Sequence, residues 1–293
     1  MENTHKKKKP WFGFTEDVIF GEIMSNKNFC KHVLQGLVPE IEIRDIHYLQ
    51  KQRKIADPEH PKQKAVILDI LVEDVDGNLY DFEMQRADKK DLGWRMRYYA
   101  SKMDQRYTLK KGSTYRNLKC CYVIFLCMFD PQGRHRIKSS YHLYEDSDKT
   151  DRLNDGLTKI IINAKGIPND ENQVTLNLVK LMNDEPVQDD PYFEEAQAKI
   201  KEFNEDPEWS DYIMDYEEKI LEREQDAREE GLIKGREEGK EEGFKEGIVY
   251  GIHNLITIMR DYGENNQRIL QRLKQKYGSD FTDEQLENFL KQN

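Results

Sequence analysis

The sequence has few of the features that mark secreted, zinc-binding or membrane-spanning proteins. Its 293 residues include only four cysteines, which lie among apolar neighbours and show no zinc-pair spacing: Cys30, Cys120, Cys121 and Cys127. Buried free thiols in a reducing compartment are therefore expected. No apolar run approaches the ~20 residues that span a bilayer, and no apolar segment of signal-peptide length follows the basic stretch Lys6–Lys9. The sequence predicts a cytoplasmic protein with no membrane segment.

Apolar residues are also scarce, at 37% of the chain against 35% charged residues. Part of the chain is therefore expected to form elongated, solvated helix. Residues 1–168 hold 30 Lys/Arg and 24 Asp/Glu, whereas residues 169–293 hold 16 and 32. The front half thus carries a net positive charge, which is compatible with a polyanion ligand, and the acidic balance belongs to the rear.

Two strand-length runs form the most informative stretch. Val66–Val72 is apolar except for Asp69, and Leu79–Gln85 follows after a turn at Asp76-Gly77-Asn78. An Asp-Gly type turn between two such runs predicts a β-hairpin. A carboxylate inside a buried strand is costly unless it is paired or binds a metal, so Asp69 needs an explanation.

The second run alternates polar Asp81, Glu83 and Gln85 with apolar residues, so one face is expected to be polar and the other apolar. One explanation of Asp69 is a hydrogen-bonded or Arg-paired carboxylate near a strand end. The other is that Asp69 and Glu83, on neighbouring strands, converge as two oxygen ligands for Mg2+ (or Mn2+). Gln85 projects from the same face as Glu83.

This Asp, followed by Glu-x-Gln on the next strand, resembles the PD-(D/E)XK nuclease superfamily, with Gln where Lys is usual. More narrowly, residues 13–166 resemble the Rpn group, the PD-(D/E)XK nuclease family transposases. Three further stretches carry that resemblance: Asp17–Phe20 of an opening helix, Arg97-Tyr98-Tyr99 of a later helix, and Ile161–Gly166 of a closing strand and turn. Gly21 departs from the pattern, since a basic residue is common there.

The resemblance implies an α/β, restriction-endonuclease-like fold: an α/β/α core with a mixed sheet, followed by an all-α C-terminal extension. It implies a Mg-dependent DNA endonuclease with catalytic Asp69, Glu83 and Gln85, metal ligands Asp69 and Glu83, and Asp17 as a further ligand. Gln85 can position a water by hydrogen bonding but carries no charge. The alternative is a catalytically weakened DNA-binding or assembly protein that keeps the nuclease fold. Recombination, mobile elements and defence are the processes that the resemblance suggests.

The order of elements predicts a mixed sheet flanked by helices, with helices only after residue 174. Helices are expected at 16–25, 27–37, 91–110, 174–183, 191–204 and 208–230, and strands at 41–49, 66–72, 79–85, 120–129, 141–144 and 157–163. Residues 51–64, with five Lys or Arg, are expected to form an exposed loop.

Basic residues on the helix at 91–110 are candidate DNA contacts. Arg95, Lys102 and Arg106 are spaced by seven and four residues, close to whole helical turns, and so share one side, whereas Arg97 falls elsewhere around the axis. The lysine-rich arm at 1–11 and the loop at 51–64 admit either phosphate contact or simple solvation.

Six glycines recur at every fourth position from Gly231 to Gly251, between charged residues. Each costs a helix ~1 kcal/mol relative to Ala. The segment is therefore either a flexible spacer or a helix whose glycines admit a close neighbour, and self-association through residues 208–293 is one expectation. The predicted division is a basic arm at 1–11, a nuclease-like domain at 12–185, a helical region at 186–230, the repeat at 231–251 and C-terminal helices at 252–293.

Overall fold

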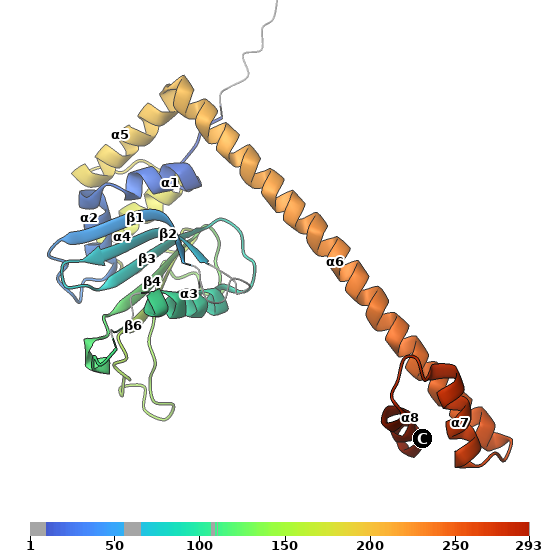
Figure 1. Ribbon diagram of the computed structural model, residues 1–293. Coiled ribbons are helices and arrows are strands. Elements are labelled where there is room, and N and C mark those ends of the chain that lie inside the picture. The colour runs from blue at the N-terminus through green and yellow to red at the C-terminus, as the bar shows by residue number, and fades with distance from the viewer. Residues whose placement is uncertain (1–9, 56–65, 107–108, 110, 293) are drawn as a thin grey trace, which may run out of the picture. The chain divides into compact units, whose positions relative to one another are not determined.

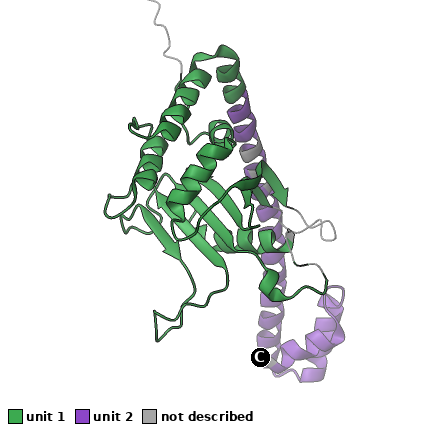
Figure 2. Ribbon diagram, turned by 90° about the vertical axis from the view of Figure 1, so that its left-hand side faces the viewer, with its two compact units in different colours: residues 1–214 green, residues 215–293 purple. Residues whose placement is uncertain are grey.

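The structure is a computed structural model that describes residues 10–55, 66–106, 109 and 111–292 (Figure 1). It divides into two compact units, one reaching Met214 and the other running from Asp215 to the C-terminus (Figure 2). Each unit has its own hydrophobic core.

The first unit is built on a six-stranded mixed sheet of order β1-β2-β3-β4-β6-β5. β3, β4 and β6 run parallel, and the other neighbouring pairs are antiparallel. The strands are β1 Ile46–Ile55, β2 Val66–Asp74, β3 Leu79–Gln85, β4 Cys121–Cys127, β5 Lys138–Tyr141 and β6 Leu157–Asn163. The predicted α/β class with a mixed sheet is confirmed.

Helices cover both faces of this sheet, as the resemblance implied. α3 lies on one face, and α1, α2, α4 and α5 lie on the other (Figure 1). Their bounds are α1 Asp17–Met24, α2 Lys27–Leu37, α3 Leu92–Arg106, α4 Gln173–Met182 and α5 Pro191–Glu205, with a short 3-10 turn η1 at Tyr115–Asn117.

Side-chain caps explain where several of these helices begin. Asn26 accepts hydrogen bonds from two backbone N–H groups at the start of α2, Asn172 caps α4, and Asp190 caps α5 directly before Pro191. α5 belongs to the first unit because the Asn204 amide donates to the Phe12 carbonyl and accepts from the Phe12 N–H, both at 2.8 Å. The compact unit thus extends beyond residue 185, where the sequence placed the end of the nuclease-like domain.

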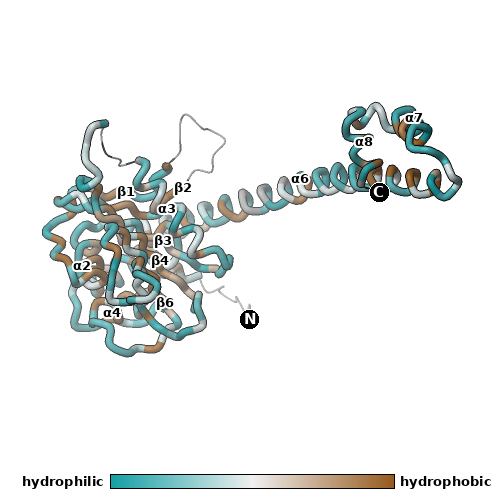
Figure 3. Tube along the Cα trace, turned by 90° about the horizontal axis from the view of Figure 1, so that it is seen from below, coloured by the Kyte–Doolittle hydropathy of each residue, from teal (hydrophilic) through white to brown (hydrophobic). Residues whose placement is uncertain are grey.

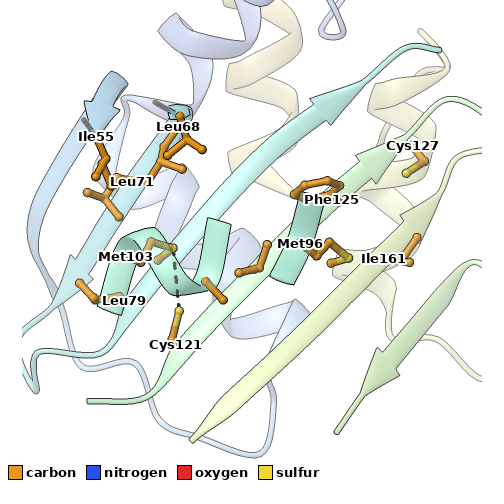
Figure 4. Close-up of a cluster of buried hydrophobic side chains, with 13 residues drawn as sticks. Ile55, Leu68, Leu71, Leu79, Met96, Met103, Cys121, Phe125, Cys127 and Ile161 are labelled. Carbon is orange, nitrogen blue, oxygen red and sulfur yellow. Dashed lines mark hydrogen bonds between the residues drawn. The ribbon is translucent and has the colours of Figure 1, made fainter. Parts of the chain in front are cut away.

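The core between the sheet and α3 positions the polar residues described below. Met96, Ala100 and Met103 of α3 pack over Val123 and Phe125 of the central strand β4 (Figure 4). Full burial of such a side chain contributes roughly 1.5 to 3 kcal/mol, so α3 is held firmly in place. The cysteines are free thiols, and three of the four are buried.

The two edge strands differ from their predicted positions. β1 covers Ile46–Ile55, later than the expected 41–49, and includes Lys51–Ile55, which were assigned to a loop. The rest of that loop, 56–64, lies outside the described residues, as do residues 1–9 of the basic arm. β5 covers Lys138–Tyr141 and not 141–144. Both strands pair on one side only, and their exposed, polar residues give no apolar pattern.

The second unit consists of helices. α6 runs from Pro207 in the first unit to Asp261, and α7 Asn266–Tyr277 and α8 Asp283–Gln292 follow. Figure 3 shows that much of α6 is hydrophilic, with apolar residues gathered near its end. There Ile252 and Ile256 pack with Ile269, Leu273 and Leu286. In the described residues, no helix is both long and apolar enough to cross a membrane.

The glycine repeat lies within α6 and is helical throughout. A Cβ added at Gly231, Gly235, Gly239, Gly243 or Gly247 would meet no atom within 4 Å. At Gly251 it would lie 3.0 Å from the Tyr277 hydroxyl of α7. Within the described residues of the second unit, therefore, only Gly251, the last glycine of the series, has another helix packed close to it.

Candidate active site

The antiparallel strands β2 and β3 separate at Asp69 and Glu83. Regular pairing runs from Glu73 with Leu79 to Ile70 with Phe82. Beyond that point the Asp69 N–H donates to Glu83 Oε1 at 2.9 Å, and the Met84 N–H donates to Asp69 Oδ2 at 3.0 Å. Each acid thus uses one carboxyl oxygen to bridge the gap between the strands and keeps the other oxygen for a different partner.

The backbone around Asp69 is irregular on both neighbouring strands. Leu68 and Leu71 are three residues apart yet belong to the same cluster under α3, so the usual alternation of side chains is broken between them. On β1, Lys51 and Arg53 pair with Ile70 and Leu68, and Gln52 between them has a φ of 49°. Such local distortions of the backbone redirect side chains, and the Asp69 carboxyl here lies across from the Met84 N–H, beside Glu83.

Asp81 joins these two acids from a deeper position. It is fully buried, and Glu83 is 2% exposed. Alternation along β3 puts Asp81, Glu83 and Gln85 on the face that α3 covers, opposite Val123, Phe125 and Cys127 of β4. With both Asp81 and Glu83 ionised, neither carboxyl oxygen of Asp81 has a hydrogen-bond partner among the described residues. The polar face expected for β3 is therefore buried rather than open to solvent.

Burial raises the pKa values of all three acids, and nearby carboxylates raise them further. Burial raises the pKa of Asp69 to about 7, with a smaller contribution from the charge of Asp17. Burial, followed by the charges of Asp81 and Asp69, raises the pKa of Glu83 well above its ordinary value. Burial, followed by the charge of Asp69, does the same for Asp81. Because two ionised carboxylates cannot hydrogen-bond to each other, Asp81 and Glu83 can do so only when one of them is protonated.

One guanidinium faces this group of acids. Arg95 of α3 lies with Nη2 3.8 Å from Glu83 Oε2, and its Nη1 donates to Gln85 Oε1. The same Nη2 donates to the Tyr99 hydroxyl at 3.2 Å. The guanidinium carbon is 5.6 Å from the ring centroids of Tyr99 and Phe125, close enough for cation–π attraction.

Comparison with known proteins identifies the family. A family model described as PD-(D/E)XK nuclease family transposase matches residues 12–229, about three quarters of the chain. The chain belongs to this family. No curated protein and no solved structure matches it significantly. The match includes the separated strands, α3 and the start of α6, and it confirms the expected family and fold.

The family's opening helix brings Asp17 near the acids. Asp17, the first residue of α1, is exposed, and its charge acts on Asp69. Its neighbour Glu16 forms an ion pair with Arg86, which follows β3. Asp17 therefore lies on the solvent side of the acids, whereas Asp81 lies on the inner side.

The acids fit a divalent cation that takes few protein ligands. Within the described ranges, no three His, Cys, Asp or Glu side chains are grouped as a complete metal cage. Mg2+ does not require one, since it is bound through one or two carboxylates and keeps several waters. Asp69 Oδ1 and Glu83 Oε2 are the oxygens that do not bridge the strands. A cation held there would also favour ionisation of Asp81, because an opposite charge nearby lowers the pKa of a carboxyl group.

The four basic residues of α3 that were candidates for DNA contact have different surroundings. Arg95 faces the acids, and Arg97 is exposed. Lys102 is 3% exposed, and its Nζ donates to Gln105 Oε1 at 3.3 Å and lies 5.5 Å from the centroid of the Tyr98 ring. The Arg106 side chain lies outside the described part of the chain. Of the three side chains described, Arg97 has the surroundings that suit a phosphate contact.

Sequence reasoning did not include Asp81 and Tyr99 among the site residues. The signal for Asp81 was its spacing of two from Glu83, which puts both on one face of the strand. The signal for Tyr99 was its spacing of four from Arg95, which puts both on one side of the helix. Neither spacing shows that the strand and the helix turn these faces toward each other.

Proposed function

We propose that this family member is a divalent-metal-dependent DNA endonuclease whose reaction centre contains Asp69, Glu83 and Gln85. The observation that supports this most strongly is that two buried carboxyls, Asp81 and Glu83, and the half-buried carboxyl of Asp69 lie together beside the Arg95 guanidinium. Burying like charges together opposes folding unless a cation offsets them. A nuclease site provides the reason, because the cation it binds is needed for the chemistry.

The cation that suits these ligands is Mg2+, with Mn2+ as a substitute, because both prefer oxygen donors. Asp69 and Glu83 would hold it, and Asp17 would add a ligand from the solvent side. When bound, such a cation polarises the scissile phosphate and lowers the pKa of a coordinated water.

The chain's own residues orient the reactants. Asp69 and Glu83 are fixed by backbone N–H groups of the opposite strand, so their free oxygens are preorganised. Gln85 supplies a neutral amide to hydrogen-bond the attacking water or a phosphate oxygen. These roles predict that Gln85→Ala lowers turnover more than it lowers metal affinity.

DNA is proposed to approach from the α3 side of the sheet. Arg97 is exposed on that helix. Residues 169–214, which include α4 and α5 on the other face, hold 13 Asp/Glu against 3 Lys/Arg and would repel a duplex. Recombination, mobile-element activity and defence are the processes proposed for such an enzyme.

Self-association through residues 208–293 is the second proposed interaction. Five of the six glycines in α6 leave open space around their Cα atoms. Small residues allow two helices to approach closely, and a second copy of α6 would offer the same surface.

Cleavage of supercoiled plasmid tests the proposed function. With Mg2+ or Mn2+ the protein is expected to nick plasmid, and EDTA is expected to abolish nicking. Asp69→Ala and Glu83→Ala are each expected to abolish it while the protein stays folded, because removing one of the acids relieves repulsion among the others. Metal and DNA binding without cleavage by the wild type would instead identify a DNA-binding or assembly protein.

A further inference from the structure

The orientation of the Gln85 side chain is determined by its contact with Arg95. A guanidinium carries N–H donors and no acceptor. The amide atom that faces Arg95 Nη1 must therefore be Oε1, as the structure has it. The reversed amide would set the N–H groups of Gln85 against the N–H groups of Arg95, with no acceptor between them.

The other half of the amide is thereby directed away from Arg95. Within the described part of the chain, Gln85 Nε2 donates no hydrogen bond to the protein, and 6% of the Gln85 surface is exposed. Gln85 therefore offers two N–H donors to an oxygen that enters the site. Without Arg95, the amide could turn over and offer its acceptor.

Arg95 is itself held in place from several sides. Tyr99 Oη accepts from Nη2, Glu83 Oε2 lies 3.8 Å away, and the rings of Tyr99 and Phe125 flank the guanidinium. Only a quarter of the Arg95 side chain is exposed. These contacts fix the positive charge of Arg95 behind Gln85, at the distance of one hydrogen bond. They explain the position of Arg95 without a direct contact with DNA.

We infer that Arg95 is a positioning residue that holds Gln85 as a hydrogen-bond donor toward the substrate phosphate or the attacking water and places a permanent positive charge behind it. Gln85 and Arg95 together thus supply the donor and the charge that one cationic side chain could supply alone. This role rests on the proposed nuclease function, since it describes how the same site meets an oxyanion.

An exchange of the two side-chain types tests the inference. Kinetics of plasmid nicking are compared for wild type, Gln85→Lys, Arg95→Gln and the double variant Q85K/R95Q. Lys201→Gln is the control, because it removes a positive charge from an exposed position of α5, on the other face of the sheet. Gln85→Lys sets an ammonium against the guanidinium, and Arg95→Gln removes the charge and frees the amide. Each single change is expected to lower kcat by about tenfold or more with little change in KM, because a preorganised donor acts mainly in the transition state.

The double variant restores a single cation with N–H donors, so its kcat is expected to exceed that of either single variant by about tenfold. If Arg95 had only a structural role, the losses in kcat of the two single variants would add in the double variant. A double variant whose kcat is no higher than that of the worse single variant therefore overturns the inference. Circular dichroism confirms that each variant is folded. Absence of cleavage by wild type with any divalent metal would count against the nuclease function.

An NMR measurement decides the inference even in that case. In protein labelled with 15N at glutamine, the Gln85 side-chain amide is the pair of signals missing from Gln85→Lys. Arg95→Met, which adds no glutamine signal, is expected to shift or split that pair, because the amide can then turn over, whereas Lys201→Met leaves it in place. A Gln85 pair that is unchanged in Arg95→Met shows that Arg95 does not orient it.

Discussion

At the scale of residues, the site combines an electrostatic cost with a fixed geometry. Burial raises the pKa of Asp69, Asp81 and Glu83, and the charge of Asp69 raises the pKa of the other two further. In the described residues, only Arg95 offsets this charge within hydrogen-bonding or ion-pair distance. Backbone N–H groups nevertheless hold Asp69 and Glu83 in place. Such a balance is typical of functional sites, where local stability is lost in exchange for a ligand-ready arrangement.

This cost predicts how the metal-free protein responds to pH. The folded state raises the pKa of Asp69 from its ordinary 3.8 to about 7. A group whose pKa is raised by folding binds its proton more tightly in the folded state. Its stabilising contribution is therefore complete below about pH 4 and is lost as pH rises through about 7. In EDTA, Tm is expected to fall between these values.

Asp69→Asn supplies the comparison, because the amide keeps the shape of the side chain and does not titrate. This variant is expected to show a smaller fall in Tm over the same pH range. Each change of about 1 kcal/mol in the free energy of unfolding shifts Tm by roughly 2 to 4 °C for a unit of this size. Parallel curves for the variant and the wild type would show that Asp69 does not titrate in this way.

The residue scale also shows what the sequence could predict. Asp69, Glu83 and Gln85 were found because a charge in an apolar strand and a spacing of two are visible in one dimension. Asp81 was not included because alternation shows only that it shares a polar face with Glu83 and Gln85, and not that α3 buries that face. Arg95 was assigned to DNA contact because helical spacing shows which residues share a side but not what that side faces.

At the scale of elements, prediction succeeded for strands with neighbours on both sides. β3 and β6 have the predicted bounds, and β2 and β4 lie within two residues of theirs. These strands bury apolar side chains, which leave a pattern in the sequence. β1 and β5 are the edge strands. These two strands are defined mainly by backbone hydrogen bonds to a single neighbouring strand. Backbone hydrogen bonds leave no pattern of apolar residues in the sequence.

The glycines of α6 give a prediction about helix stability. Gly239→Ala is expected to stabilise α6 by about 1 kcal/mol, because Ala has the higher helix propensity and the added Cβ meets open space. Gly251→Ala is the matched control, since its Cβ would lie 3.0 Å from the Tyr277 hydroxyl. Thermal unfolding followed by circular dichroism measures both. Equal stabilisation by the two changes would mean that Tyr277 does not pack against Gly251.

At the scale of the whole molecule, charge is distributed differently from what the sequence alone indicated. The acidic excess after residue 168 was assigned to a tail, but residues 169–214 carry a net charge of −10 and belong to the first compact unit. The first unit thus combines a positive front part with acidic helices. The boundary could not be predicted, because contacts such as that between Asn204 and Phe12 join residues far apart in sequence.

Self-association is tested by comparing the full chain with a chain that ends at Met214, where the first unit ends. If residues 208–293 join two copies, sedimentation at tens of micromolar should show the full chain as a dimer or larger and the shortened chain as a monomer. Monomers in both samples would exclude association through this segment at that concentration.

The central claim is that the separated ends of β2 and β3 form a metal-dependent site for DNA cleavage. Its most direct test compares Glu83→Gln with Glu73→Gln, since Glu73 lies in the same hairpin opposite Leu79 and away from Arg95. With Mg2+ and plasmid, we expect Glu73→Gln to cleave at close to the wild-type rate and Glu83→Gln to lose about 100-fold or more. Cleavage by Glu83→Gln at the wild-type rate would contradict the account.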